Sequence, residues 1–116
     1  MTTDLHYLIS FPSGAMVVRP EEFDDVVRDS HAVIQEAKDA GVYVFGGGID
    51  ESVEPVRVSA DGTVTPGPYP QFSGLAGGHT VLRLPSREAA VEWAAKIAAA
   101  CRCPQELRVF GYDPES

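Results

Sequence analysis

The segment from Thr63 to Ala94 constrains the fold of this chain more than any other part of the sequence. Five glycines and three prolines occur between Gly62 and Gly78, which is typical of a loop shaped by backbone turns and placed beside a pocket. The segment from Gly78 to Leu84, which opens with glycine and carries Val81, Leu82 and Leu84, then predicts a strand. Ser86 is a typical N-cap for the helix that follows. The segment therefore predicts a loop, a strand and a capped helix in that order.

The rest of the chain predicts a second set of similar elements. Alternating apolar residues indicate a strand over residues 4–11, and Pro20 begins a helix that Gly41 ends. Residues 42–45 predict a strand, residues 53–58 and Val64 a small hairpin, and residues 106–112 a last strand. The order predicts an α+β, ferredoxin-like β-α-β-β-α-β fold with an extra hairpin, in which both helices cover one face of an antiparallel sheet.

Helical spacing predicts which residues of each helix face the sheet. In the first helix these are Phe23, Val26, Val27, Ser30, Ile34 and Ala37, and in the second they are Ala90, Trp93, Ala94, Ile97 and Cys101. The opposite face of the sheet would carry Leu8, Val81 and Phe110, which is a large apolar surface for a monomer to expose. Pairing two such faces across a two-fold axis would cover it, so we expect a homodimer.

The sequences Thr-Val-Thr-Pro-Gly-Pro-Tyr at 63–69, Gly77-Gly78 and the Ser86 helix with Glu-Trp-Ala at 92–94 resemble the YCII-related family, in its DGPF-domain branch. The resemblance covers nearly all of residues 1–116 and implies one domain that forms a dimeric α+β barrel with a cavity between the sheets. The chain departs from the family's Asp-Gly-Pro-Phe motif at Pro66 and Tyr69, so no role of that aspartate carries over. Most members of the family are uncharacterised.

Charge and hydropathy exclude several classes of partner. Seventeen acidic against nine basic residues give a net charge of −8, which opposes binding to nucleic acid or to an anionic membrane surface. The sequence lacks an apolar run of the roughly 18 residues that a spanning helix needs, and its first residues do not resemble a signal peptide. We therefore expect a cytoplasmic protein that binds neither nucleic acid nor membrane.

The two cysteines and the glycine run carry no strong chemical signal. Cys101 and Cys103 are separated by one residue, which strains a disulfide, and they are too few for a structural zinc site. A redox thiol beside Arg102 is an alternative, but reduced structural cysteines are the favoured interpretation. The run Gly46-Gly47-Gly48 has no phosphate-loop spacing and predicts a strand end that bends. We expect no metal and no cofactor.

His31 and Asp50 are the candidate catalytic pair. The YCII-related family often carries a histidine about ten residues before the glycine that ends its first helix, here Gly41, and that histidine and an aspartate have been proposed as a catalytic-like pair. Asp50, on the flexible backbone after the glycine run, is the nearest acid, although it does not match the family's aspartate. If the two meet, the carboxylate would orient the ring and raise its pKa. The favoured alternative is a half-buried helix histidine and a solvated turn acid.

A second group of candidates lies on the predicted open face of the sheet. His6, His79, Arg83 and Arg108 would share this face and favour a polar or anionic ligand. His6 and His79 both begin their strands, so an antiparallel pairing would place them at opposite ends of the face. In that arrangement they are separate polar residues near the rims.

Three classes of function remain open at this point. A homodimer whose inter-sheet cavity binds a small polar or anionic metabolite is the first. The alternatives are a small lyase, isomerase or dehalogenase that uses His31 for proton transfer, and a regulatory protein. The last follows from the resemblance, because DGPF-type proteins are often associated with extracytoplasmic-function sigma factors. Haem or oxygen chemistry is the least favoured, since no axial-ligand site stands out.

Overall fold

A computed structural model describes residues 4–116. Its central sheet consists, within that range, of β1 (Leu5–Pro12), β2 (Tyr43–Gly48), β5 (Gly77–Leu84) and β6 (Glu106–Val109), in the order β2-β5-β1-β6 with every neighbour antiparallel. β3 (Val56–Val58) and β4 (Val64–Pro66) form a separate two-stranded hairpin. The predicted α+β class is confirmed, and the strand order is consistent with a ferredoxin-like fold.

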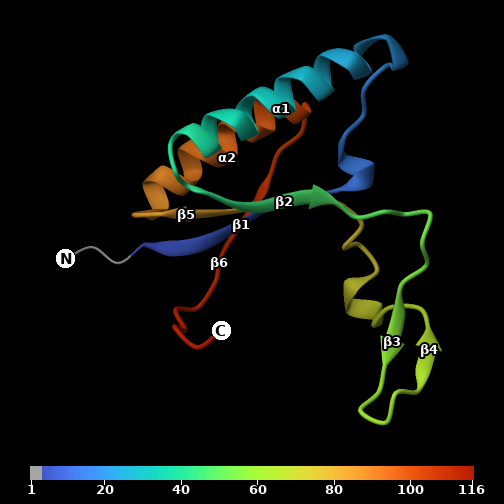
Figure 1. The fold of residues 1–116 in the computed structure, drawn as a ribbon. Helices are drawn as coiled ribbons and strands as arrows, with labels where there is room; N and C mark the ends of the chain where they lie inside the picture. The colour runs from blue at the N-terminus through green and yellow to red at the C-terminus, as the bar shows by residue number, and fades with distance from the viewer. Residues whose placement is uncertain (1–3) are drawn as a thin grey trace.

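Helices α1 (Phe23–Asp39) and α2 (Arg87–Cys101) lie side by side on one face of the sheet (Figure 1). Ser86 caps α2, because its hydroxyl oxygen accepts a hydrogen bond from the backbone N–H of Ala89 at 3.1 Å. Pro20–Glu22 forms a short 3-10 turn before α1, so the α-helix begins three residues later than the sequence indicated. Two further 3-10 turns cover Ser13–Ala15 (η1) and Pro70–Phe72 (η3).

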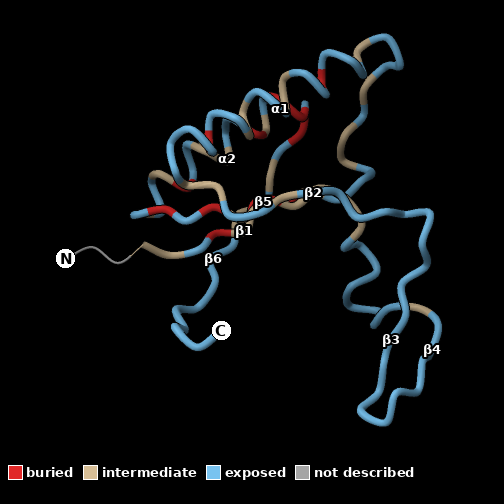
Figure 2. The backbone as a smooth tube through the Cα atoms, in the orientation of Figure 1, coloured by how far each residue is buried: buried red, intermediate tan, exposed pale blue. Residues whose placement is uncertain are grey.

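The core lies between the helices and the sheet, as the red segments in Figure 2 show. Alternation along the strands places Tyr7 and Ile9 of β1 opposite Leu82 and Thr80 of β5 on the helix-covered face. Ile9, Leu82 and Leu84 are the largest side chains that are almost completely buried. Within residues 4–116, no helix combines the length and apolarity needed to cross a bilayer.

The stripe predicted for α1 is only partly buried. Val26 and Ala37 are enclosed, but Phe23 is 53% exposed and Val27 is 36% exposed. Figure 1 shows the reason, because α1 diverges from the sheet towards its N-terminal end. In α2 the predicted stripe holds for Ala90, Ile97 and Cys101, which are buried. The space beneath the first half of α1 is therefore left unfilled by the core.

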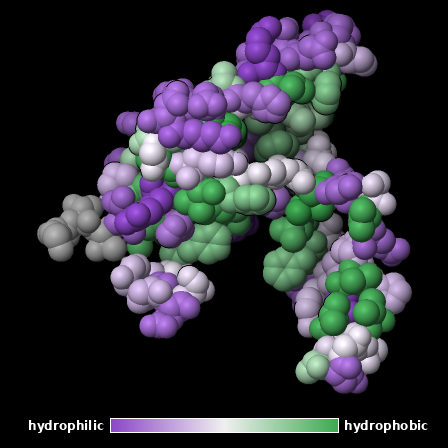
Figure 3. All heavy atoms as spheres, viewed as in Figure 1, coloured by the Kyte–Doolittle hydropathy of each residue, from purple (hydrophilic) through white to green (hydrophobic). Residues whose placement is uncertain are grey.

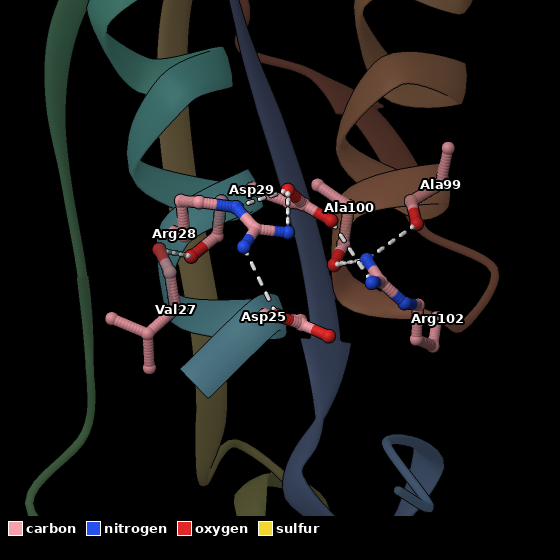
Figure 4. A network of polar contacts seen from close by, with 8 residues as sticks. Asp25, Val27, Arg28, Asp29, Ala99, Ala100 and Arg102 are labelled. Atoms are coloured by element: carbon pink, nitrogen blue, oxygen red, sulfur yellow. Dashed lines mark hydrogen bonds and ion pairs between the residues drawn. The ribbon is translucent and has the colours of Figure 1, made fainter. Parts of the chain in front are cut away.

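The last turn of α2 is tied to α1 by a polar network (Figure 4). Arg102 ends the helix in the left-handed region, at φ 61°, and its guanidinium donates to the backbone oxygens of Ala99 and Ala100. The same guanidinium donates to Asp29 of α1 at 2.9 Å. This bond, with Arg28 beside it, lowers the pKa of the Asp29 carboxyl. The network thus joins the two helices at one end.

Three sequence predictions about local structure differ from the structure. β2 continues through Gly46–Gly48, where a bend was expected, because those residues remain paired with β5. β6 ends at Val109, before the predicted Tyr112, and the ladder continues only as a hydrogen bond from the Phe110 N–H to the His6 oxygen. The extended piece predicted from residue 53 is a strand only over Val56–Val58.

Candidate functional site

A cavity of about 570 Å³ lies on the helix side of the sheet, beneath the N-terminal half of α1. We call it the helix-side cavity. Its floor is the C-terminal end of β2 and the start of β5, and apolar side chains of β1, α1, α2 and the chain after β1 form the walls. These apolar residues are Phe11, Met16, Phe23, Val26, Val27, Val33, Ile34 and Ile97.

Glycines create this space by leaving side chains out of the floor. In the ladder Gly46 pairs with Thr80 and Gly48 pairs with Gly78, so these four positions alternate onto the face that the helices cover. A Cβ on Gly48 would meet nothing nearer than the Gly77 oxygen at 3.6 Å. A Cβ on Gly78 would lie 2.6 Å from the Phe11 ring. The floor of the cavity is consequently bare backbone at its three glycines, with the Thr80 side chain as its fourth position, and the Phe11 ring closes it at one side.

Polar side chains line both the exposed edge of the cavity and its floor. Glu51, in the loop after β2, accepts a hydrogen bond from the Ser13 hydroxyl at 3.3 Å. Ser30 of α1 donates its hydroxyl to the Val27 oxygen at 3.0 Å, and Thr80 is buried in the floor. The described lining residues include no lysine and no arginine. Glu51 is thus the charged group that a ligand entering here would meet.

His31 borders the helix-side cavity, whereas Asp50 does not. His31 is exposed, and within residues 4–116 its ring makes no hydrogen bond or ion pair. Asp50 accepts hydrogen bonds from the hydroxyl of Ser52 at 2.6 Å and from its backbone N–H at 3.0 Å, which lower the pKa of the Asp50 carboxyl. The predicted pair is therefore not joined, and Asp50 closes a local turn. The acid that shares the cavity with His31 is Glu51.

The predicted ligand-binding residues all lie on the open face of the sheet, but at different places. The ladder pairs His6 with Arg83 at one end and Ser10 with His79 at the other. The two histidines therefore lie at opposite ends of the face, as the antiparallel register predicted. His79 also contributes to the wall of the helix-side cavity, and because its ring points to the open face we assign that contribution to its backbone.

A second hollow, of about 560 Å³, lies at the His6 end of the open face. His6 and Arg83 line it, together with Phe110 and the C-terminal segment up to Ser116. Asp4 and Asp113 line it as well, and Asp4 lies 3.9 Å from Arg83. We call it the open-face hollow. Its one arginine is partly offset by these two carboxylates.

The other two predicted ligand-binding residues have partners within the chain. Arg108 forms an ion pair with Glu106 of the same strand at 2.5 Å and does not line the open-face hollow. The His79 ring nitrogen Nε2 lies 2.8 Å from the backbone oxygen of Leu75. His79 thereby fastens the turn before β5 beneath the sheet.

The two cysteines are buried thiols. Cys101 and Cys103 are free and buried, and burial raises the pKa of both thiols. The thiol of Cys101, which borders the helix-side cavity, therefore stays protonated near neutral pH. Residues 4–116 contain no group of three or more His, Cys, Asp or Glu side chains placed to hold a metal ion.

Sequence reasoning missed the helix-side cavity and the contribution of Ser13 and Glu51. One signal was present, since two paired strands both carry glycine where they approach the same end of the sheet. A scan of the chain against protein-family models finds no match, and a search of curated proteins finds none either.

Proposed function

We propose that this protein binds a small molecule in the helix-side cavity, and that the ligand has an apolar body and a neutral or positively charged polar end. The observation that carries this proposal is a cavity of about 570 Å³ whose floor is mostly glycine backbone and whose walls are apolar. Small-molecule sites usually have roughly 300–1,000 Å³, apolar walls and a few polar groups that orient the ligand.

The charge of the ligand follows from the groups at the mouth. Glu51 supplies a carboxylate, Ser13 and His31 supply hydrogen-bonding groups, and the described lining has no lysine or arginine to neutralise an anion. The net charge of −8 also disfavours an approaching anion. For the open-face hollow an anionic ligand stays a prediction. Arg83 and His6 would contact it there, and the nearby carboxylates of Asp4 and Asp113 partly offset the positive charge of Arg83.

A matched pair of glycine variants tests the site. Gly48→Val places an isopropyl group on the face of β2 that forms the floor, whereas Gly47→Val places the same group on the opposite face, where a Cβ meets no atom within 4 Å. The probes are 2-phenylethylamine, 2-phenylethanol and phenylacetate, which share an aromatic body and differ in charge. Binding is followed by NMR titration of the backbone amides of residues 46–48 and 77–80.

We expect saturable binding of the amine and the alcohol, with phenylacetate the weakest of the three. Gly48→Val should weaken the amine at least about tenfold, which corresponds to about 1.4 kcal/mol, while Gly47→Val leaves it within about twofold. The proposal would be contradicted if the two variants bound the amine with equal dissociation constants. Titrations that stay linear to millimolar concentration for all three probes would also contradict it.

A second candidate function is an enzyme in which His31 transfers a proton. The observation that favours it is that His31 and Glu51 border one cavity, so a substrate held there would lie between an imidazole, which can accept or donate a proton, and a carboxylate. A screen of lactones with wild type and His31→Ala tests it. Turnover that His31→Ala abolishes while folding is kept supports the enzyme, and turnover equal to wild type removes His31 from the mechanism.

We further propose that two copies of the chain pair through their open sheet faces. Phe45 on β2 is 70% exposed and Tyr112 beyond β6 is 70% exposed, while Leu8, Val81 and Phe110 lie between them on the same face. Burying such a surface is favourable, at roughly 25 cal/mol per Å² of apolar area. Light scattering at micromolar concentration measures the mass directly, and a value of 12.4 kDa would refute the dimer.

A further inference from the structure

The β3–β4 hairpin is a projecting arm that the rest of the chain hardly covers. It extends away from the sheet and the helices (Figure 1), and residues 49–66 are exposed along their whole length (Figure 2). Its strands pair with each other and, within residues 4–116, with no other strand. A two-stranded hairpin is at best marginally stable in water without further packing. The arm therefore needs a surface to pack on.

The two faces of the arm differ in character. The register pairs Val56 with Pro66 and Val58 with Val64, and these four apolar residues share one face because alternate residues point to opposite sides. Val58 is 66% exposed and Val64 is 59% exposed. We call this the valine face of the arm.

The opposite face carries Arg57 and Thr65. The Arg57 guanidinium lies 5.8 Å from the centre of the Tyr69 ring, so the chain's own next segment already covers part of this face. Among residues 4–116, the valine face is the side that no other segment covers.

The charge pattern indicates what covers it. Residues 62–82 contain no lysine, arginine, aspartate or glutamate, although the whole chain has 26 such residues in its 116. Two copies of a protein of net charge −8 repel each other less where the surfaces that meet are free of acids. The four side chains of the valine face and the segment that follows it meet that condition, and the arm's acids Glu54 and Asp61 lie outside those four positions. A second copy of this chain therefore fits the surface, with no opposite charge needed.

The arm also adjoins the open face through which the dimer is proposed to form. Phe72 and Leu75, in the connection from β4 to β5, are exposed, and His79 holds that connection beneath the sheet. Figure 3 shows hydrophobic residues both under the sheet and along the limb that carries β3 and β4, on two sides of one recess. A copy entering this recess would meet both surfaces.

We propose that the valine face of each arm packs against the second copy of the chain, so that the two arms clasp the homodimer. This inference rests on the homodimer of the proposed function. Neighbouring residues of β4 offer a matched test, because Val64→Glu puts a charge on the valine face and Thr65→Glu puts the same charge on the other face. Sedimentation equilibrium measures the dimer dissociation constant, and circular dichroism checks the fold.

We expect Val64→Glu to raise the dissociation constant of the dimer at least about tenfold, which corresponds to about 1.4 kcal/mol. Thr65→Glu should change it less than about threefold. Equal constants for Val64→Glu and wild type would overturn the clasp while the open-face dimer stands. A wild type that stays monomeric would overturn both proposals.

A second measurement keeps the clasp testable if Val64→Glu unfolds the arm. In a wild-type dimer mixed from labelled and unlabelled chains, isotope-filtered NOEs report contacts between copies. We expect such NOEs at the methyl groups of Val58 and Val64. Methyl groups that show NOEs only within their own chain would overturn the inference.

Discussion

Gly77→Ala tests how the start of β5 fixes the floor of the cavity. Gly77 has φ +150°, and a Cβ there would lie 2.0 Å from the Phe11 oxygen and 2.9 Å from both the Pro12 Cα and the Ser13 nitrogen. All three atoms belong to backbone, so no side-chain rotation relieves the overlap. The end of β1 or the start of β5 has to move.

The cost follows from the bonds that this movement breaks. The Gly77 oxygen accepts from the Ile49 N–H at 2.9 Å, and the Ala76 oxygen accepts from the Ser13 N–H at 2.9 Å. The two hydrogen bonds contribute about 1 kcal/mol each, and a backbone conformation that suits glycine costs alanine about 1–3 kcal/mol. The free energy of unfolding should therefore fall by about 3–5 kcal/mol. For a domain of this size that lowers Tm by about 12–20 °C.

Urea denaturation and calorimetry measure both quantities. Gly74→Ala is the matched control, because it lies in the same connection, its Cβ meets no atom within 4 Å, and its φ is not positive. We expect the control to stay within about 1 kcal/mol of wild type. A Gly77→Ala variant equal to that control would refute the argument from the close approach of β1 and β5.

Two further predictions concern the network between the helices. Arg102→Ala should be less stable than wild type because it loses the hydrogen bonds to Ala99, Ala100 and Asp29. Arg102→Gly should have a free energy of unfolding about 1 kcal/mol higher than Arg102→Ala in urea denaturation, because glycine accepts φ 61° without strain. Equal stabilities of these two variants would contradict the strain. Because the pKa of Asp29 is lowered in the folded protein, its contribution to stability is present above the ordinary value of 3.8 and is lost as the pH falls through the folded value. The stability difference between wild type and Asp29→Asn should therefore be largest above about pH 5 and shrink below pH 4. A difference that is constant from pH 7 to pH 2 would contradict this prediction.

The strands and helices were readable from the sequence because their signals are local. Alternation along β1 and β5 gave both faces of the sheet, and it also placed His6 and His79 at opposite ends. The prediction that the strand bends at Gly46–Gly48 was wrong. Glycine usually weakens a strand, and the sequence does not show that β5 pairs with all three residues.

The candidate site was less predictable because loop paths decide it. Asp50 and Glu51 are neighbours in the sequence, yet Asp50 turns towards Ser52 and Glu51 reaches Ser13 at the mouth of the cavity. Only the three-dimensional course of the loop after β2 distinguishes the two acids. The same holds for α1, whose apolar stripe gave no sign that Phe23 and Val27 face a cavity.

The glycine floor implies that the cavity is kept at a cost to stability, and Gly48→Val measures that cost. Glycine inside a strand is destabilising by roughly 0.5–1 kcal/mol, and a Cβ at residue 48 meets only the Gly77 oxygen, at an ordinary contact distance of 3.6 Å. Valine should therefore raise the free energy of unfolding by about that amount while it occupies part of the cavity and weakens ligand binding. Gly47→Val should gain similar stability without losing the ligand. If Gly48→Val were instead less stable than wild type, the backbone of β2 would itself require glycine at residue 48. The cavity above it would then be a by-product of that requirement and would not indicate a ligand.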